Sequence, residues 1–326
     1  MDEIGGDPGA SPFSGSLFAR LDGLDRIISL QRLKPNLLGR LLTQTQLNAR
    51  GFLLCLLALL LLLVLPYLLE RLLRRYGWVR PNFRQEVIPQ SFGLYILLFV
   101  VCMGGALLFL LPSAWEQYGG WLLLAVGYGL LGGMDDRWGN AKYRGFKGHF
   151  RAVFQDRVVT TGFLKAVLGL VFAFCLAWRL ASDSPLRLLL ATLLIALGAN
   201  VMNLFDLRPG RACAVFLVAS IPLLLCFWQW GGWRAGVPPF LLIVLPVWRV
   251  WEKDARAKVM LGDAGSNLLG AALGYACAQP TFSLGFQGGI VVLFLAIHLL
   301  AEKISFTQEI ERRPFLRFLD RLTGVR

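Results

Sequence analysis

The sequence predicts an all-α, polytopic membrane protein with about nine transmembrane helices. Of its 326 residues, 56% are hydrophobic and only 16% are charged. The mean hydropathy of +0.60 is too high for a soluble domain, whose surface must be wetted. Apolar runs of about 20 residues, the length that spans roughly 30 Å of hydrocarbon as an α-helix, also recur along the chain.

Nine apolar segments are expected to form the spans of a transmembrane domain over residues 51–303. An N-terminal extension, residues 1–50, precedes them. It begins with the Gly/Pro/Ser-rich stretch GGDPGASPFSGS, predicted to be disordered, and continues into a predicted amphipathic interfacial helix. In chain order the nine spans are 51–69, 91–112, 120–134, 162–180, 186–204, 212–230, 237–250, 264–278 and 287–302.

The positively charged residues follow the predicted membrane topology. The formal net charge is +13, and the Lys and Arg residues fall mainly in alternate joins between spans. The positive-inside rule places these basic joins in the cytoplasm, where they also meet anionic headgroups, so no nucleic-acid partner is needed to explain the charge. The same alternation places residues 1–50 outside, although that segment is itself of mixed charge. The basic joins are 70–90, 135–161, 205–211, 249–262 and the tail 303–326.

Four aspartates lie at span ends on this one membrane face. Asp135 and Asp136 follow the third span in GGMDDRWG, and Asp206 follows the fifth span in ANVMNLFDLRPGRA. Asp263 begins the eighth span in AKVMLGDAGSNLLG. Converging acids would repel one another unless a cation held them, and hard oxygen ligands suit Mg²⁺ or Mn²⁺.

Polar and basic neighbours indicate a phosphate-bearing ligand for such a site. Asn200 and Asn203 precede Asp206 at helical spacing, so two amides and a carboxylate are expected to project together. Mg²⁺ usually keeps coordination positions open for water and substrate phosphate. The basic residues nearby are Lys165, Arg208, Arg211 and Lys258.

Each acid also has a purely structural interpretation. The pair Asp135–Asp136 could be solvated or paired with Arg137 at the membrane boundary. Asp263 could cap the eighth span, and its neighbouring glycines Gly265 and Gly270 could be close helix-packing positions. The amide face of the fifth span could serve interhelical hydrogen bonds. The coincidence of side and residue type across three separate joins favours the joint, metal-and-phosphate interpretation.

The motifs GGMDDRWG, NVMNLFD and AKVMLGDAGS, in this order, resemble those of the polyprenyl-phosphate N-acetylhexosamine-1-phosphate transferases. This group contains phospho-MurNAc-pentapeptide translocase and the GlcNAc-1-phosphate transferases. RPNFRQEVIPQSFG, with Asn82 and Arg84, is similar to that family's N-x-R…P…G stretch. Together the matches cover most of residues 75–275, and their joint specificity is high.

The resemblance implies a reaction and a location. A polyprenyl phosphate such as undecaprenyl phosphate would attack the sugar-linked phosphorus of a UDP-aminosugar and release UMP, for cell-envelope glycan synthesis. Mg²⁺ would neutralise the diphosphate, while a carboxylate of the Asp135–Asp136 pair would accept the lipid phosphate proton or orient that nucleophile. A bacterial inner membrane, with the active site on its cytoplasmic face, is the expected location. A homodimer is a further expectation.

Site residues follow from the resemblance by position. Asp263 and Asp206 are the expected metal ligands, and together with Asp135 and Asp136 they form the expected catalytic set. Lys165 is expected to contact substrate phosphate. The remaining residues expected to bind substrate are Asn200, Asn203, Arg208, Arg211, Asn82 and Arg84.

Two departures from the family pattern favour an alternative. The family continues DGxDGL after the amide pair, but this chain has DLRPGRA, which loses an acid and adds Arg208 and Arg211. The loop after the ninth span lacks the family's histidine cluster. These departures favour a membrane protein that has lost catalysis and binds the lipid carrier or an envelope-assembly partner. A secondary transporter is disfavoured, because its ionisable residues belong near the bilayer midplane.

The tail 304–326 is predicted to form a basic amphipathic helix on the cytoplasmic leaflet. Its apolar residues alternate at helical spacing with arginines in EIERRPFLRFLDRLTG. A lid over the site is the alternative role for this segment.

Overall fold

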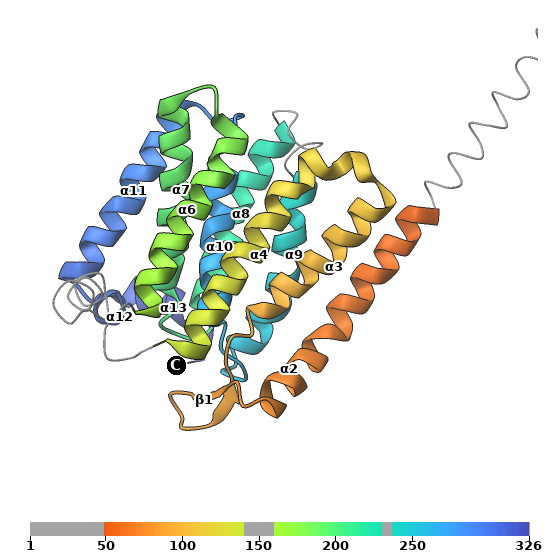
Figure 1. The fold of residues 1–326 in the computed structure, drawn as a ribbon. Coiled ribbons are helices and arrows are strands. Elements are labelled where there is room, and N and C mark those ends of the chain that lie inside the picture. Colours follow the sequence, from red (N-terminus) through yellow and green to blue (C-terminus); the bar gives the residue numbers. More distant parts are fainter. Residues whose placement is uncertain (1–48, 140–159, 230–236, 326) are drawn as a thin grey trace, which may run out of the picture. The chain divides into compact units, whose positions relative to one another are not determined.

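The computed structural model describes residues 49–139, 160–229 and 237–325, and the fold is almost entirely helical (Figure 1). Most of the N-terminal extension lies outside the described residues. After a first helix, Ala49–Leu63, the helices are α2 (Leu65–Arg75), α3 (Leu94–Leu110), α4 (Trp115–Trp138), α6 (Thr161–Ala181), α7 (Pro185–Phe205), α8 (Arg211–Gln229), α9 (Val237–Asp254), α10 (Gly262–Cys277), α11 (Leu284–Lys303), α12 (Phe306–Arg312) and α13 (Pro314–Thr323).

The length and apolar composition of its helices make this a multi-pass membrane protein. Four helices, α6, α7, α8 and α11, are long and apolar enough to cross a membrane. The helix Ala49–Leu63 and α2, bent by 41° where they meet, count as a fifth span if taken together. Each of the other predicted spans is a helix as well, but α3 has 17 residues and α10 has 16. The number of nine spans is therefore not confirmed.

The central helix of the bundle is α10, which packs against α7, α4 and α8 (Figure 1). All of its residues from Ala264 to Cys277 are buried. Glycines allow this close approach, because a Cβ at Gly270 would collide with the carbonyl oxygen of Gly198 in α7. A Cβ at Gly265 would likewise meet the backbone of Gly93, which confirms both glycines as packing positions. The packing brings the start of α10 to the ends of α4 and α7.

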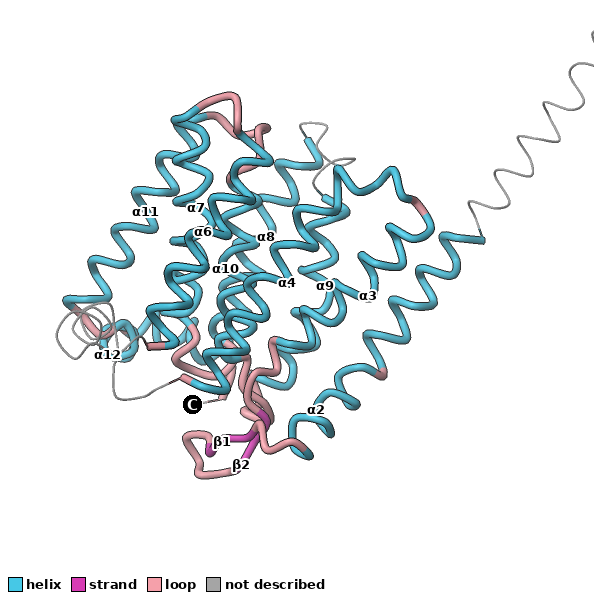
Figure 2. Tube along the Cα trace, in the orientation of Figure 1, coloured by secondary structure: helices cyan, strands magenta, loops and turns pink. Residues whose placement is uncertain are grey.

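A two-stranded hairpin between α2 and α3 is an addition to the predicted all-α fold. Strands β1 (Val79–Pro81) and β2 (Val87–Pro89) pair antiparallel, with Arg80 opposite Ile88 (Figure 2). The chain after β2 bonds to the loop before α10, because the N–H of Met260 donates to the carbonyl of Pro89 at 2.8 Å. The hairpin is thereby held beside the start of α10.

Candidate active site

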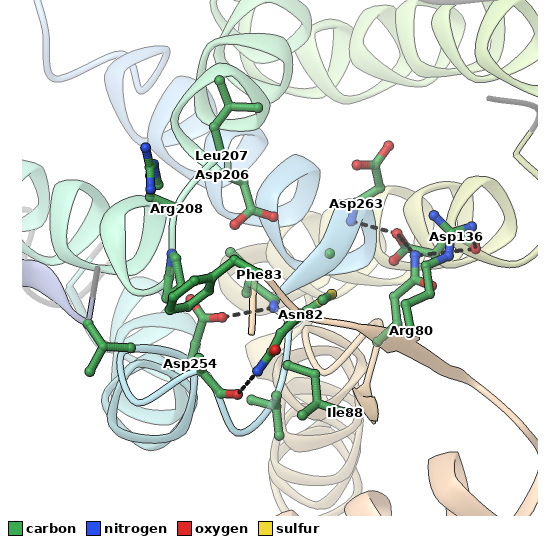
Figure 3. A pocket seen from close by; sticks show the side chains of 18 residues that line it. Arg80, Asn82, Phe83, Ile88, Asp136, Asp206, Leu207, Arg208, Asp254 and Asp263 are labelled. Carbon is green, nitrogen blue, oxygen red and sulfur yellow. Dashed lines mark hydrogen bonds between the residues drawn. The ribbon is translucent and has the colours of Figure 1, made fainter. Parts of the chain in front are cut away.

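A cavity of about 540 Å³ opens where the ends of α4, α7 and α9 meet the start of α10 and the hairpin. Figure 3 shows Arg80 beside Asp136 on one side of this cavity, with Arg208 and Asp206 on the other. The charged and amide residues in its lining are Arg80, Asn82, Gln90, Asp136, Asp206, Arg208, Asp254 and Asp263.

Three predicted site residues from three different helices form one charged cluster. Lys165, in the first turns of α6, donates from Nζ to Oδ2 of Asp135 at 2.9 Å. The same ammonium forms an ion pair with the carboxylate of Asp263 at the start of α10. All three side chains keep some solvent exposure. The ammonium thus lies between two carboxylates that would otherwise repel each other.

Asp136 has different surroundings from its neighbour Asp135. The residue is 8% exposed, and its two carboxylate oxygens accept the backbone N–H groups of Asp263 at 3.0 Å and Ala264 at 3.1 Å. The side chain of Gln90 donates to the same carboxylate at 3.1 Å. Asp136 therefore caps α10 from another helix, satisfying N–H groups that a helix start leaves without intrahelical partners. This carboxylate, and not that of Asp263, caps the helix.

The fifth predicted span ends before its carboxylate. Helix α7 stops at Phe205, and Asp206 follows as the C-cap residue, lining the cavity. Asn203 accepts a hydrogen bond from the Ser266 hydroxyl at 3.1 Å and so links α7 to α10. Asn200 lines a smaller cavity of about 50 Å³ together with Lys165. The helical spacing predicted that the two amides and Asp206 project together, and this was wrong. Of these three residues, only Asp206 lines the main cavity.

The main cavity concentrates negative charge around Asp206. Burial raises the pKa of the Asp206 carboxyl well above its usual range, and the carboxylates of Asp254 and Asp263 raise it further. Asp254, which the sequence analysis missed, is 4% exposed at the end of α9. Its oxygens accept the N–H groups of Gly210 at 2.8 Å and Leu261 at 3.4 Å. Like the other acids, Asp254 lies at the end of a predicted span in a basic join. In WEKDARAK it is surrounded by basic residues, so it was not distinguished from an ordinary charged join.

The donor set fits a divalent cation that is bound together with phosphate. Asp206 and Asp263 offer hard carboxylate oxygens, and a cation would relieve the repulsion among the acids, which adds to the effect of burial in raising the pKa of Asp206. Over residues 49–139, 160–229 and 237–325, no three His, Cys, Asp or Glu residues are grouped closely enough to hold a metal by themselves. Mg²⁺ is commonly bound by one or two carboxylates plus substrate phosphates, and Asp206 and Asp263 supply two carboxylates to the cavity lining.

The predicted substrate-binding residues divide between the cavity and other places. Asn82 lines the cavity, and its amide donates to the carbonyl of Ala257 at 3.2 Å. Arg84 is exposed and stacks over the Phe83 ring at 5.0 Å, outside the lining. Arg80, which the sequence analysis did not single out, lines the cavity in its place.

The two arginines of DLRPGRA also differ in their surroundings. Arg208 lines the cavity and pairs with Glu311. Arg211 is 3% exposed and is not part of the lining, because its Nε donates to Asp320 at 2.6 Å.

The model of the family described as glycosyl transferase family 4 matches residues 118–280, half of the chain. The chain belongs to glycosyl transferase family 4. This is the family of phospho-MurNAc-pentapeptide translocase and the UDP-GlcNAc:undecaprenyl-phosphate GlcNAc-1-phosphate transferases. No curated protein matches the sequence. The glycosyl transferase family 4 region contains the Asp135, Lys165 and Asp263 cluster, whereas the hairpin and the C-terminal helices lie outside it.

Proposed function

We propose that this protein transfers a sugar-1-phosphate from a UDP-aminosugar to a polyprenyl phosphate such as undecaprenyl phosphate, for cell-envelope glycan synthesis. An oxygen of the lipid phosphate attacks the sugar-linked phosphorus, the bond from that phosphorus to the UMP oxygen breaks, and UMP leaves. The family match supports the reaction class. The single observation that carries the proposal is the meeting of Asp135, Lys165 and Asp263 at one end of the bundle, beside an acid-lined cavity.

The surroundings of the two adjacent acids suggest their separate roles. Asp135 makes its ion pair with Lys165 and caps none of the helices in the described part of the chain, so its carboxylate is the better placed to take the proton from the lipid phosphate or to orient that group. Asp136 holds the backbone of Asp263 and thereby positions the start of α10. Arg80 and Arg208 supply positive charge for a diphosphate from the cavity lining.

The proposed cofactor follows from the same acids. Asp263 and Asp206 would hold Mg²⁺, or Mn²⁺, which when bound neutralises diphosphate charge and stabilises the UMP leaving group. The buried carboxylate of Asp254 adds negative charge on the Asp206 side of the cavity. Lys165 balances the opposite side through its two ion pairs.

The proposed location is a bacterial inner membrane, with the cavity facing the cytoplasm. Support comes from the basic joins that surround the cavity, whose residues include Arg80, Arg208 and Lys253. Joins near the other helix ends, such as the one around Asp183, carry almost no Lys or Arg. This asymmetry is that of the positive-inside rule.

A second candidate function is binding of the lipid carrier without catalysis. One observation favours it: Arg211, added where the family pattern has none, is buried in an ion pair and is absent from the cavity lining. On this account the family chemistry has been replaced by a structural contact. The two candidates differ in whether UMP is released.

The test measures UMP release by detergent-purified protein given undecaprenyl phosphate and a panel of UDP-sugars, with and without Mg²⁺. We expect metal-dependent release from the wild type that Asp135→Asn and Asp263→Asn both abolish. Asp183→Asn, a matched change at an exposed aspartate remote from the cavity lining, should retain it. Retained binding of prenyl phosphate with no release from any donor would instead establish the non-catalytic candidate.

A further inference from the structure

The C-terminal segment, residues 306–325, folds back onto the loops that border the cavity. The N–H of Val325 donates to the carbonyl of Ala255 at 2.7 Å, just after α9. The indole N–H of Trp251 donates to the carbonyl of Thr323 at 2.9 Å. Val325 is itself part of the cavity lining. The end of the chain therefore forms a piece of the cavity wall.

Backbone contacts at two glycines show how closely this segment packs. Gly210, with φ +77°, leaves no space for a Cβ, which would collide with the carbonyl oxygen of Thr323. A Cβ at Gly324 would collide with the carbonyl oxygen of Pro209. The segment and the α7–α8 loop therefore fit together backbone to backbone, which a loose surface helix does not require.

Arg208 in the α7–α8 loop and Arg211, which begins α8, pair with acids of the C-terminal segment. Arg211 and Asp320 form a pair in which both side chains are buried, and Arg211 also donates to the Thr307 hydroxyl at 3.4 Å. Arg208 pairs with Glu311 closer to the surface. Losing one partner of a buried pair leaves the other charge uncompensated, so the Arg211–Asp320 contact is hard to break.

The same loop connects to both expected metal ligands. Asp206 begins it, and Gly210 within it donates to the buried Asp254 carboxylate at 2.8 Å. The second oxygen of Asp254 accepts the N–H of Leu261, two residues before Asp263. Movement of the loop would therefore be transmitted to both sides of the cavity.

We propose that Arg211 and Asp320 are positioning residues, which hold the C-terminal segment against the α7–α8 loop so that the segment closes one wall of the cavity and fixes Asp206. The role rests on the proposed transfer reaction. It differs from that of a lipid-bound tail, because the buried contacts face protein loops. It also accounts for the two arginines that distinguish DLRPGRA from the family pattern.

A positioning role predicts a particular kinetic effect. Asp320→Asn keeps the shape of the side chain but removes its charge, so the loop should lose its fixed position while the catalytic cluster at Lys165 stays intact. We expect the KM for the UDP-sugar, and the Mg²⁺ concentration for half-maximal activity, to rise about tenfold with kcat changed less than about threefold. Arg211→Lys, which keeps the charge, should raise the KM less than Arg211→Gln, which removes it.

Trypsin provides a readout that does not depend on activity. It cleaves after arginine, and cleavage within α13 requires local opening of the helix and its release from the loops. Asp320→Asn and Arg211→Gln should each speed the loss of C-terminal peptides about tenfold, and the double variant should be no faster than either, since the residues act as one pair. Arg313→Gln, which breaks an exposed pair with Glu309 in the same segment, is the matched control and should not change the rate.

The outcomes separate the two proposals. An unchanged cleavage rate in both variants would show that the Arg211–Asp320 pair does not hold the segment in place. Faster cleavage with an unchanged KM would show that the segment stabilises the fold but does not position Asp206. If the wild type releases no UMP while cleavage responds as expected, the proposed reaction fails and the pairing stands.

Discussion

At the scale of single residues, two adjacent carboxylates have different surroundings because they leave the last turn of α4 in different directions. Asp135 points to the ammonium of Lys165, whereas Asp136 points to the N–H groups that begin α10. The sequence placed both acids at the correct span end but could not divide their roles. That division depends on the rotation of α4 about its axis, which its packing against α10, α3 and α6 sets.

This difference predicts that substitution of Asp136 lowers stability, whereas substitution of Asp135 removes activity. Asp136→Ala leaves two helix-start N–H groups without their partner and should destabilise the protein by about 2 kcal/mol. Asp135→Asn should leave stability close to that of the wild type while abolishing UMP release. Both variants are tested by thermal unfolding in detergent and by the UMP assay, which together check whether stability depends on Asp136 and activity on Asp135. Equal loss of stability in the two variants would contradict it.

At the scale of elements, the outer and central helices differ in how clearly their composition marks them as membrane spans. Helices such as α8 and α11 are long and apolar enough to cross a membrane, whereas α10, predicted as a span over 264–278, has 16 residues and is built of small ones for close packing. The hairpin was missed because its three-residue strands each contain a proline and show no alternation. The basic join 70–90 that contains it was recognised by its charge and by the resemblance of RPNFRQEVIPQSFG to the family's N-x-R…P…G stretch, neither of which indicates strands.

Close packing of α10 predicts a strong effect at Gly270. A Cβ there would collide with the backbone of Gly198, so Gly270→Ala should cost about 1–3 kcal/mol of stability through overpacking. Gly288→Ala, in the second turn of α11 with no neighbouring atom near its Cβ position, is the control and should be neutral or slightly stabilising. Thermal unfolding of the two variants decides. A tolerated alanine at Gly270 would mean that α10 and α7 are further apart.

At the scale of the whole molecule, the cavity is assembled from parts far apart in the chain. Spacing and resemblance predicted Asp135, Lys165 and Asp263, which do meet. They did not predict Asp254 or Arg80, because nothing in a linear motif shows that the end of α9 and a hairpin strand border the same cavity. The residues of a motif can be located from sequence, but the supporting residues around them require the fold.

The charge asymmetry predicts the orientation in the membrane. A cysteine introduced at Ser182, in the join that lacks basic residues, should react with a membrane-impermeant thiol reagent in intact cells. A cysteine at Lys258, close to the cavity, should react only after permeabilisation. The wild type, with its six native cysteines, provides the background. The reverse labelling pattern would place the cavity outside the cytoplasm.

The central claim is that the sugar-linked phosphorus moves together with the sugar. The most direct test supplies a UDP-sugar that is radiolabelled only in its β-phosphate, with undecaprenyl phosphate and Mg²⁺, and follows the label. The account predicts that the label enters the lipid-extractable fraction, that the released nucleotide is unlabelled UMP, and that Asp135→Asn blocks both. Label that stays in the nucleotide, as released UDP or as untouched donor, would contradict the account.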